Sequence, residues 1–323
     1  MTTGVAPGDA MPALVLEAIG APPRLATFPV PVADEDERIV RVRAAGLAPF
    51  DLAYSAGRHS LGRPPTPSVV GREGVGLADD GERVYFDNAT APFGSVAPAA
   101  PVHRDRLYPV HPAVDDATAI ALGAPGIAAW LSLVERARVC AQDTVVVLGA
   151  TGAVGSLCLQ LARLMGVERV VAVARGGPRL ERCLDLGATA TVALDTPYLA
   201  AAIHAAAGDS VDVVVDLLWG EPAQAALTAC GIGGRFVQVG NAAAPAALMP
   251  ANPWRTNWVS ILGYSSFHAS VDQRRRAYAE VLAHAAAGRL VTTTQAVAFA
   301  EAEAAWQTLA NGPRAKVVVV VDD

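Results

Sequence analysis

The chain has 323 residues, 52% of them apolar, and a formal net charge of −6. This length allows two domains or one large one, and the mild charge without a stripe of Lys and Arg argues against nucleic acid and anionic membrane partners. No apolar run approaches the roughly 18 residues of a membrane span, and the four scattered cysteines form no C-x-x-C pair, so we expect no metal site or disulfide framework and a cytoplasmic location.

The first ten residues lack the basic start and apolar core of a secretory signal, and we expect them to form a loose extension. From Met11 to about residue 115 the sequence predicts short strands between turns rich in Pro and Gly. In RIVRVRAAGL, apolar and charged residues alternate as in a half-buried strand, with Ile39, Val42 and Ala44 among the apolar positions. This part of the chain is predicted to be a β-rich block.

From about residue 118 strands alternate with helices. The segment DDATAIALGAPGIAAWLSLVERA carries acidic residues early and apolar residues at helical spacing, which predicts one helix. Strands are predicted at 145–150, 169–174, 191–194, 211–218, 235–239 and 259–263. Strands that alternate with helices in this way predict a parallel, doubly wound α/β sheet.

The last sixty residues predict a helix near 272–287 that ends at Gly288, a strand near Val297, a second helix and an apolar terminal strand, KVVVVV. We expect this tail to fold back onto the N-terminal β block. The predicted domains are then residues 1–117 with 266–323, and residues 118–265 inserted between them.

Gly149, Gly152 and Gly155 have the spacing G-x-x-G-x-x-G where a predicted strand meets a predicted helix. Glycines at such a junction permit a tight turn, close approach to a pyrophosphate and close helix–strand packing. The alternative is a glycine-rich turn that only packs. The helix is predicted to bury the stripe Val154, Leu157, Cys158, Leu161 and Leu164.

Arg175 lies 20 residues beyond Gly155, where the NAD form of this unit carries an acidic residue. The segment ARGGPRL, residues 174–180, contains no acid, and Arg179 adds a second positive charge. A guanidinium suits a 2′-phosphate, so NADPH is predicted over NADH. The alternative is that both arginines are solvated surface residues.

Several segments, in order and spacing, resemble the medium-chain dehydrogenase/reductases, in particular their zinc-independent quinone oxidoreductase branch: VRAAGLAPFDLAYSAG, VVGREGVG, GERVYF, LGATGAVGSLCLQLARLMG, LDLGATATV, GGRFVQVG and ILGYS. The resemblance runs over nearly the whole chain from Met11. It implies an α/β protein in which a GroES-like β-rich substrate domain contains an inserted Rossmann domain. It also implies NADP(H) in the cleft between them and a homodimer through the Rossmann edge strands.

Zinc-dependent members of this family carry a cysteine in the region of AAGLAPFD and a histidine in GREG. This sequence has Leu47 and Ala48 in the first motif and Arg72 in the second, so no catalytic zinc is expected. The remaining chemistry is transfer of hydride to a small molecule, a quinone or an α,β-unsaturated carbonyl.

The cofactor contacts are predicted at the glycine turn, at the two arginines and in the loops after the fourth, fifth and sixth strands. They are Thr151, Gly152, Ala153, Val154, Arg175, Arg179, Leu217, Val239, Gly240, Asn241, Tyr264 and Ser265. Tyr264 is also a candidate for the substrate pocket. Asp216, at the end of the fourth strand, is expected to be structural.

The substrate side departs from the family, which usually has an asparagine at Ala48 and a tyrosine near Ala53. Tyr54, one position later, and Asp51, which matches the family's acidic position, are predicted to be catalytic. Alternatively, Asp51 only caps a helix, and Tyr54 points to a different face. His59 is either a proton donor or an ordinary loop residue.

These departures leave two other functions open. The chain could use the same fold for a non-reductive step in a biosynthetic pathway, or bind a nucleotide without catalysis.

Overall fold

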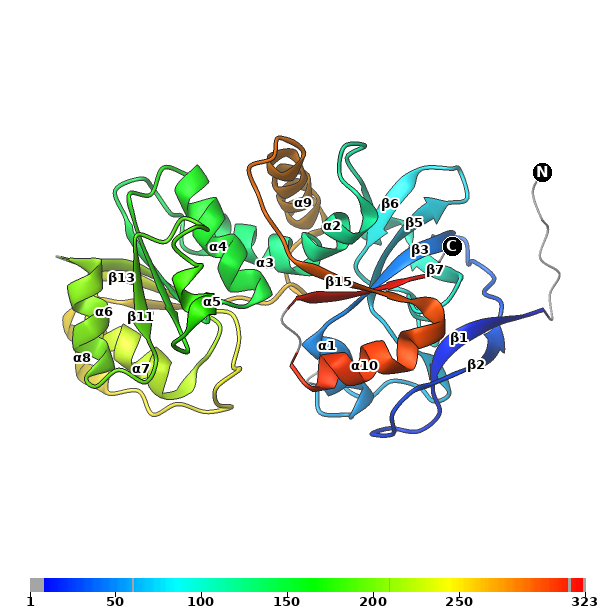
Figure 1. The fold of residues 1–323 in the computed structure, drawn as a ribbon, viewed down its shortest axis with the longest axis horizontal. Coiled ribbons are helices and arrows are strands. Elements are labelled where there is room, and N and C mark those ends of the chain that lie inside the picture. Colours follow the sequence, from blue (N-terminus) through cyan, green and yellow to red (C-terminus); the bar gives the residue numbers. More distant parts are fainter. Residues whose placement is uncertain (1–8, 60, 209, 313–314, 322–323) are drawn as a thin grey trace. The chain divides into compact units, whose positions relative to one another are not determined.

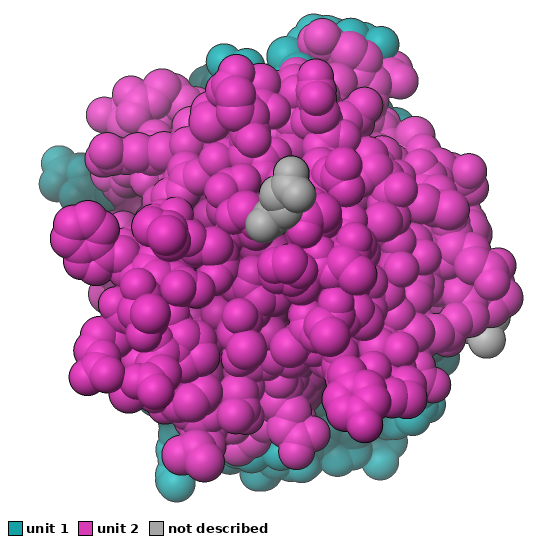
Figure 2. Space-filling model, turned by 90° about the vertical axis from the view of Figure 1, so that its left-hand side faces the viewer, with its two compact units in different colours: residues 1–124, 278–287, 292–323 teal, residues 125–277, 288–291 magenta. Residues whose placement is uncertain are grey.

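The computed structural model describes residues 9–59, 61–208, 210–312 and 315–321 (Figure 1). The chain divides into two compact units, one of residues 1–124, 278–287 and 292–323, and one of residues 125–277 and 288–291 (Figure 2). The second unit is therefore inserted in the sequence of the first. Most of the predicted N-terminal extension lies outside the described residues, and the boundaries at residues 117 and 265 stay a prediction.

The first unit is built on two sheets in which every strand pair is antiparallel except β15 with β16, which is parallel. One has the strand order β2-β1-β4, from β1 (Ala10–Leu16), β2 (Arg24–Pro29) and β4 (Ser68–Val69). The other has the order β15-β16-β3-β5-β6-β8, with β7 also paired to β3. Its strands are β3 (Glu37–Leu47), β5 (Glu73–Ala78), β6 (Arg83–Phe86), β7 (Ala99–His103), β8 (Leu107–Pro109), β15 (Thr294–Ala298) and β16 (Lys316–Val320).

The C-terminal tail folds back onto the N-terminal block, as predicted. β16 pairs antiparallel with β3, so that Val318 lies opposite Gly46. The helices of this unit are α1 (Pro49–Ser55), α2 (Asp116–Ala121) and α10 (Ala302–Ala310), together with residues 278–286 of α9 (Val271–Ala286), whose first residues belong to the second unit. Trp306 of α10 packs with Leu47 and Val317 in a buried cluster, which fixes the tail to the first strands of the chain.

The alternation predicted for β3 is present with one correction. Val40, Val42 and Ala44 are buried and the intervening arginines are exposed, whereas Ile39 is only half-buried. Ile39 and Val42 are three positions apart and so lie on opposite faces of a strand. Val40, not Ile39, belongs to the core face.

The second unit contains a parallel sheet in the order β11-β10-β9-β12-β13-β14, which confirms the predicted doubly wound arrangement. The strands are β9 (Thr144–Leu148), β10 (Arg169–Ala174), β11 (Ala190–Ala193), β12 (Val211–Asp216), β13 (Cys230–Gln238) and β14 (Ser260–Gly263). The helices are α3 (Ala124–Leu131), α4 (Ala153–Leu164), α5 (Pro178–Glu181), α6 (Leu199–Ala207), α7 (Gly220–Ala229) and α8 (Ala251–Thr256).

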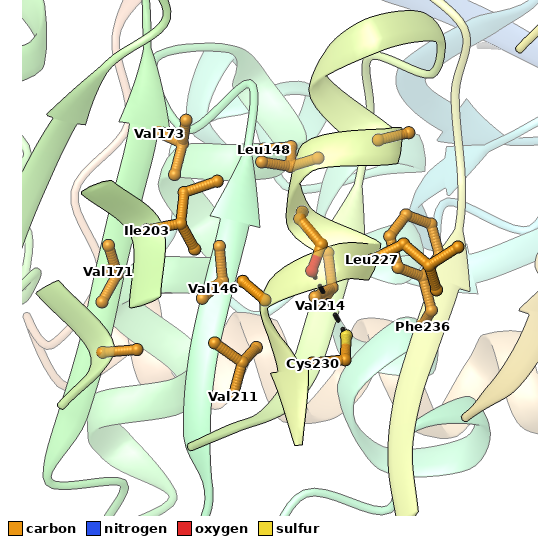
Figure 3. Packing of buried hydrophobic residues seen from close by; sticks show 14 of the residues in the cluster. Val146, Leu148, Val171, Val173, Ile203, Val211, Val214, Leu227, Cys230 and Phe236 are labelled. Atoms are coloured by element: carbon orange, nitrogen blue, oxygen red, sulfur yellow. Dashed lines mark hydrogen bonds between the residues drawn. The ribbon is translucent and has the colours of Figure 1, made fainter. Parts of the chain in front are cut away.

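Continuous apolar strands form the centre of this sheet because helices cover them. Val146 and Val214 pack with Ile203 of α6 and Leu227 of α7 in one buried cluster (Figure 3). Burial of each such side chain stabilises the fold by about 1.5–3 kcal/mol. Within the described residues, every helix is too short or too polar to cross a membrane.

The prediction of a single helix after residue 115 is wrong. α2 ends at Ala121 and α3 begins at Ala124, because the chain passes closely over buried side chains of β5 and β6. A Cβ atom on Gly123 would lie 2.4 Å from ring atoms of Tyr85, and the N–H of Ala124 donates to Oε2 of Glu73 at 3.2 Å. A continuous helix would lose that hydrogen bond.

The stripe predicted for α4 needs a similar correction. Leu157, Cys158 and Leu161 are fully buried, but Leu164 is 37% exposed at the last turn and Val154 is half-buried. The core reaches the middle turns of α4 and not its ends.

Candidate functional site

The glycine turn joins β9 to α4 in the second unit. Gly149 has a φ of +78°, a conformation that favours glycine, and its N–H donates to the carbonyl of Val173 at 2.8 Å. A Cβ atom on Gly155 would lie 2.4 Å from the carbonyl oxygen of Gly149. The first and third glycines therefore bring the start of the helix against the turn, as the motif predicts.

The start of α4 is open to an anion. Gly152 is the N-cap residue, and no side chain within the described part of the chain caps this end of the helix. Ala153 is exposed, and Thr151 and Val154 are partly exposed. First-turn N–H groups without a side-chain acceptor, together with the helix dipole, favour a phosphate oxygen.

The two predicted arginines lie beyond β10. Arg175 directly follows the last strand residue, Ala174, and its side chain is exposed. Arg179, on α5, donates from Nη2 to the carbonyl of Thr151 at 2.6 Å. The structure thus brings Arg179 onto the glycine turn, a contact that sequence reasoning did not identify.

The predicted loops after β12, β13 and β14 lie beside one another. The N–H groups of Val239 and Gly240 donate to the carbonyl of Asp216 at 2.8 and 3.1 Å. A Cβ atom on Gly240 would lie 2.9 Å from the carbonyl oxygen of Leu217. Tyr264 is tied to the end of β13 by its N–H, which donates to the carbonyl of Gln238 at 2.9 Å.

This arrangement puts most of the predicted cofactor residues of the second unit at the carboxyl ends of parallel strands. That edge is where open α/β sheets bind ligands. Asn241 and Ser265 are exposed at this edge.

Asp216 holds the turn after β12 rather than facing a ligand. Its side chain is fully buried, and Oδ1 accepts from the N–H groups of Leu218 at 2.9 Å and Trp219 at 3.0 Å. Within the described residues, Oδ2 has no hydrogen-bond partner. Burial raises the pKa of Asp216 to about 6, although the two N–H donors oppose the shift.

In the first unit, Asp51 caps the start of α1. It is 5% exposed, and its Oδ2 accepts from the N–H of Ala48 at 2.8 Å. Burial raises the pKa of Asp51 to about 6, while the Ala48 hydrogen bond and the charges of Lys316 and Arg72 lower it. The capping role left open by the sequence is therefore present.

An aromatic cluster surrounds Phe50, next to Asp51. Tyr54 stacks on Phe50 with centroids 5.4 Å apart, and the His59 ring meets it edge-on at 4.7 Å. Cζ of Arg72 lies 4.9 Å from the centroid of the same ring. Tyr54 therefore shares this cluster with Arg72 and His59.

A hollow of about 160 Å³ lies beside the cluster, wholly within the first unit. Its lining includes Phe50, Asp51, Tyr54, Arg72 and Phe93. The predicted catalytic pair, Asp51 and Tyr54, thus faces one cavity together with an arginine and aromatic rings. A largely apolar lining with a few polar groups is typical of small-molecule sites.

His59 is poorly suited to donate a proton here. Burial and the positive charge of Arg72 lower its pKa, because both disfavour the charged imidazolium form. Its Nδ1 accepts from the N–H of Leu61 at 3.2 Å. These contacts favour the interpretation of His59 as a loop residue.

Phe50 was not identified from the sequence, and Arg72 was noted only in place of a histidine. Proximity between residues 50 and 72 depends on the pairing of distant strands, so spacing alone gave no signal. The one available signal was that Arg72 occupies the position of a metal ligand in related sequences. Among the described residues, no three His, Cys, Asp or Glu side chains gather as a metal site would require.

The chain is similar to several known proteins. A family described as zinc-binding dehydrogenase matches residues 153–287. A quinone oxidoreductase of Mus musculus is 28% identical over 224 residues, which are 65% of this chain and 66% of that protein. The crystal structure of the quinone oxidoreductase from Thermus thermophilus, studied also as its complex with NADPH, is 30% identical with a TM-score of 0.81, and the match covers 96% of this chain and 100% of that one.

A much larger protein is also similar. The phenolphthiocerol synthesis polyketide synthase type I Pks15/1 of Mycobacterium bovis is 30% identical over 211 residues, which are 62% of this chain. The match covers 10% of that synthase, so the chain spans only a small part of its length.

Proposed function

Since the chain belongs to the medium-chain dehydrogenase/reductase superfamily, in its quinone oxidoreductase-like branch, we propose that it is an NADPH-dependent, zinc-independent oxidoreductase. Its acceptor is a quinone or an α,β-unsaturated carbonyl. One observation carries this proposal: the uncapped start of α4 at a glycine turn, with Arg179 bonded to that turn and Arg175 beyond the neighbouring strand.

The residues at this turn fit NADP(H). The N–H groups at Ala153 and Val154 would hold the pyrophosphate beside Gly152, whose own N–H donates to the carbonyl of Gly149 at 3.0 Å, and Arg175 with Arg179 would hold the 2′-phosphate. When bound, the reduced cofactor supplies a hydride and its two electrons. The NADPH complex of the Thermus relative supports the same cofactor here.

On the substrate side, the hollow of the first unit supports a flat acceptor. Asp51 lines it with a pKa of about 6, near enough to neutral pH for proton transfer, and Tyr54 adds a hydroxyl group. By the resemblance, Leu47 and Ala48 lie in the motif where zinc-dependent relatives carry a cysteine and Arg72 lies in the motif where they carry a histidine, which supports chemistry without zinc.

A fluorescence titration with NADPH and NADH tests the cofactor. We expect Arg175→Ala to weaken NADPH binding roughly 30-fold by loss of a charge-assisted contact, while NADH binding is unchanged. Arg182→Ala, an exposed arginine at the end of α5, is the matched control and should change neither. Equal loss for both nucleotides would contradict the proposed role of Arg175.

The same samples, followed at the nicotinamide absorbance with a panel of quinones and enones, test the reaction. Oxidation of NADPH by one acceptor class supports the proposal and identifies that class. Product formed without consumption of NADPH would instead indicate a non-reductive pathway enzyme, and binding without any product a nucleotide-binding protein.

A further inference from the structure

Arg72 is held in a fixed place at the wall of the hollow. It precedes β5, and its Nε donates to the carbonyl of Asp87 at 2.7 Å. Its Cζ lies 4.9 Å from the centre of the Phe50 ring, within cation–π range. Two contacts on different sides of one guanidinium restrict its rotation, so the positive charge is held beside the hollow before any ligand enters.

Among the described residues that line the hollow, Arg72 is the cationic one. Lys316, the other cation that acts on Asp51, bonds through Nζ to Oε1 of Glu73, whose Oε2 accepts from the hydroxyl of Tyr85 at 2.6 Å. The opposite charges of Lys316 and Glu73 therefore neutralise each other. Lys316 is not part of the lining of the hollow, whereas Arg72 is.

Neighbouring groups respond to the charge of Arg72. It contributes to the lowered pKa of His59 and opposes the rise in the pKa of Asp51, while Glu73 adds to that rise. A negative charge that develops in the same hollow should be stabilised in the same way.

We propose that Arg72 is a catalytic residue that binds the carbonyl oxygen of the acceptor in this hollow. This inference rests on the proposed function and names the group that takes up the charge of the reaction. Bound NADPH would supply a hydride to the far end of the conjugated system, which is the β-carbon of an enone or the distal oxygen of a quinone. The displaced π pair ends on the acceptor oxygen as an enolate or hydroquinone anion, and a proton from water completes the product.

An arginine is suited to this role. Donors fixed where charge develops stabilise a transition state more than mobile ones do. A guanidinium stays charged at every physiological pH, so it supplies a constant positive field where zinc-dependent relatives use a metal ion.

The first test uses 4-nitrophenol as a flat, ionisable probe, without cofactor. Binding to the wild-type chain should lower the apparent pKa of the phenol by about one unit, measured from its coloured phenolate band over a pH series. Arg72→Met should abolish the shift and Arg72→Lys should keep part of it. Arg58→Met, an exposed arginine outside the lining of the hollow, should leave it unchanged. No shift in the wild type, or an equal shift in Arg72→Met, would overturn the inference.

The second test measures oxidation of NADPH by the best quinone or enone. Arg72→Met should lower kcat roughly 100-fold, the size seen when one oxyanion donor is removed, while the Kd for NADPH stays constant. Wild-type turnover in a folded Arg72→Met variant would refute the role of Arg72 and leave the proposed function intact. Absence of turnover in the wild type would refute the proposed function, and the phenol titration would still decide whether the anion site exists.

Discussion

Two buried carboxyl groups, Asp51 and Asp216, have similarly raised pKa values near 6 in different surroundings. Asp51 lies among the charges of Lys316, Glu73 and Arg72. Asp216 receives only backbone N–H donors, and one of its oxygens has no partner among the described residues. A buried carboxylate without a cation is costly, so ionisation of Asp216 opposes folding at neutral pH.

Asp216→Asn should make the free energy of unfolding less sensitive to rising pH. The folded pKa of Asp216 lies above the ordinary value of 3.8, so the folded state binds more protons between pH 3.8 and 6, and wild-type stability falls as pH rises through this range. An asparagine oxygen can still accept both N–H donors. We expect the free energy of unfolding of the variant, relative to wild type, to increase by about 1 kcal/mol from pH 5 to 8 in urea titrations. Parallel pH curves would contradict this, and Asp195→Asn, at an exposed position, is the control.

The elements of the second unit could be predicted closely from the sequence because local signals agreed there. Strand β10 matches its prediction at both ends, and the glycine turn lies where its spacing indicated. The interruption at Gly123 could not be predicted, since it depends on Tyr85 of a distant strand. For the same reason the sequence predicts only Asp51 and Tyr54 among the residues of the hollow. Its aromatic residues and Arg72 come together only through the pairing of distant strands.

Gly155→Ala tests how tightly α4 is packed against the turn. The added Cβ atom would lie 2.4 Å from the Gly149 oxygen and 2.8 Å from the Ala150 Cα, both backbone atoms that cannot rotate away. The start of α4 must therefore shift, which we expect to destabilise the protein by about 1–3 kcal/mol and to weaken NADPH binding at least tenfold. Ser156→Ala, the next position of the helix, should change stability by less than about 0.5 kcal/mol. Thermal unfolding and NADPH titration of both variants measure these effects. Wild-type affinity for NADPH in Gly155→Ala would argue against close packing of α4 on the turn.

At the scale of the molecule, strands from the N-terminal and C-terminal parts of the described chain are joined within the first unit. The last described strand, β16, pairs with β3, and Lys316 at its start bonds to Glu73 of β5 in the interior. The side chains of this pair are only 6% and 4% exposed. The pair connects the C-terminal strand to the N-terminal sheet.

Removal of one charge of this pair should lower the free energy of unfolding by more than removal of both charges. Lys316→Met leaves the Glu73 charge buried with only neutral donors, which we expect to lower the free energy of unfolding by about 3–5 kcal/mol. Lys316→Met combined with Glu73→Gln removes that charge and should regain a large part of the loss. Urea unfolding of wild type, both single variants and the double variant measures the coupling. Additive effects would mean that the two side chains act independently.

We propose that the protein forms a homodimer through the β14 edge of the parallel sheet in the second unit. β14 is the last strand in the described order of this sheet, and edge strands can pair with another chain. The nearby Ile232 and Trp258 are 82% and 83% exposed, and large apolar side chains exposed together often mark an interaction surface. Their segments are adjacent, because the N–H of Gly233 donates to the carbonyl of Asn257 at 2.7 Å. Ile232→Asp with Trp258→Asp should convert a dimer into a monomer in light scattering, since a buried charge opposes association.

Val32→Asp is the control for this experiment, because Val32 is 75% exposed in the other unit and its replacement should leave the dimer intact. A monomeric wild type, or a dimer that survives the double substitution, would contradict the proposed interface. Turnover should persist in the monomer, since the glycine turn and the hollow are each built from residues of a single chain. An inactive but folded monomer would show instead that the second copy is needed to complete the site.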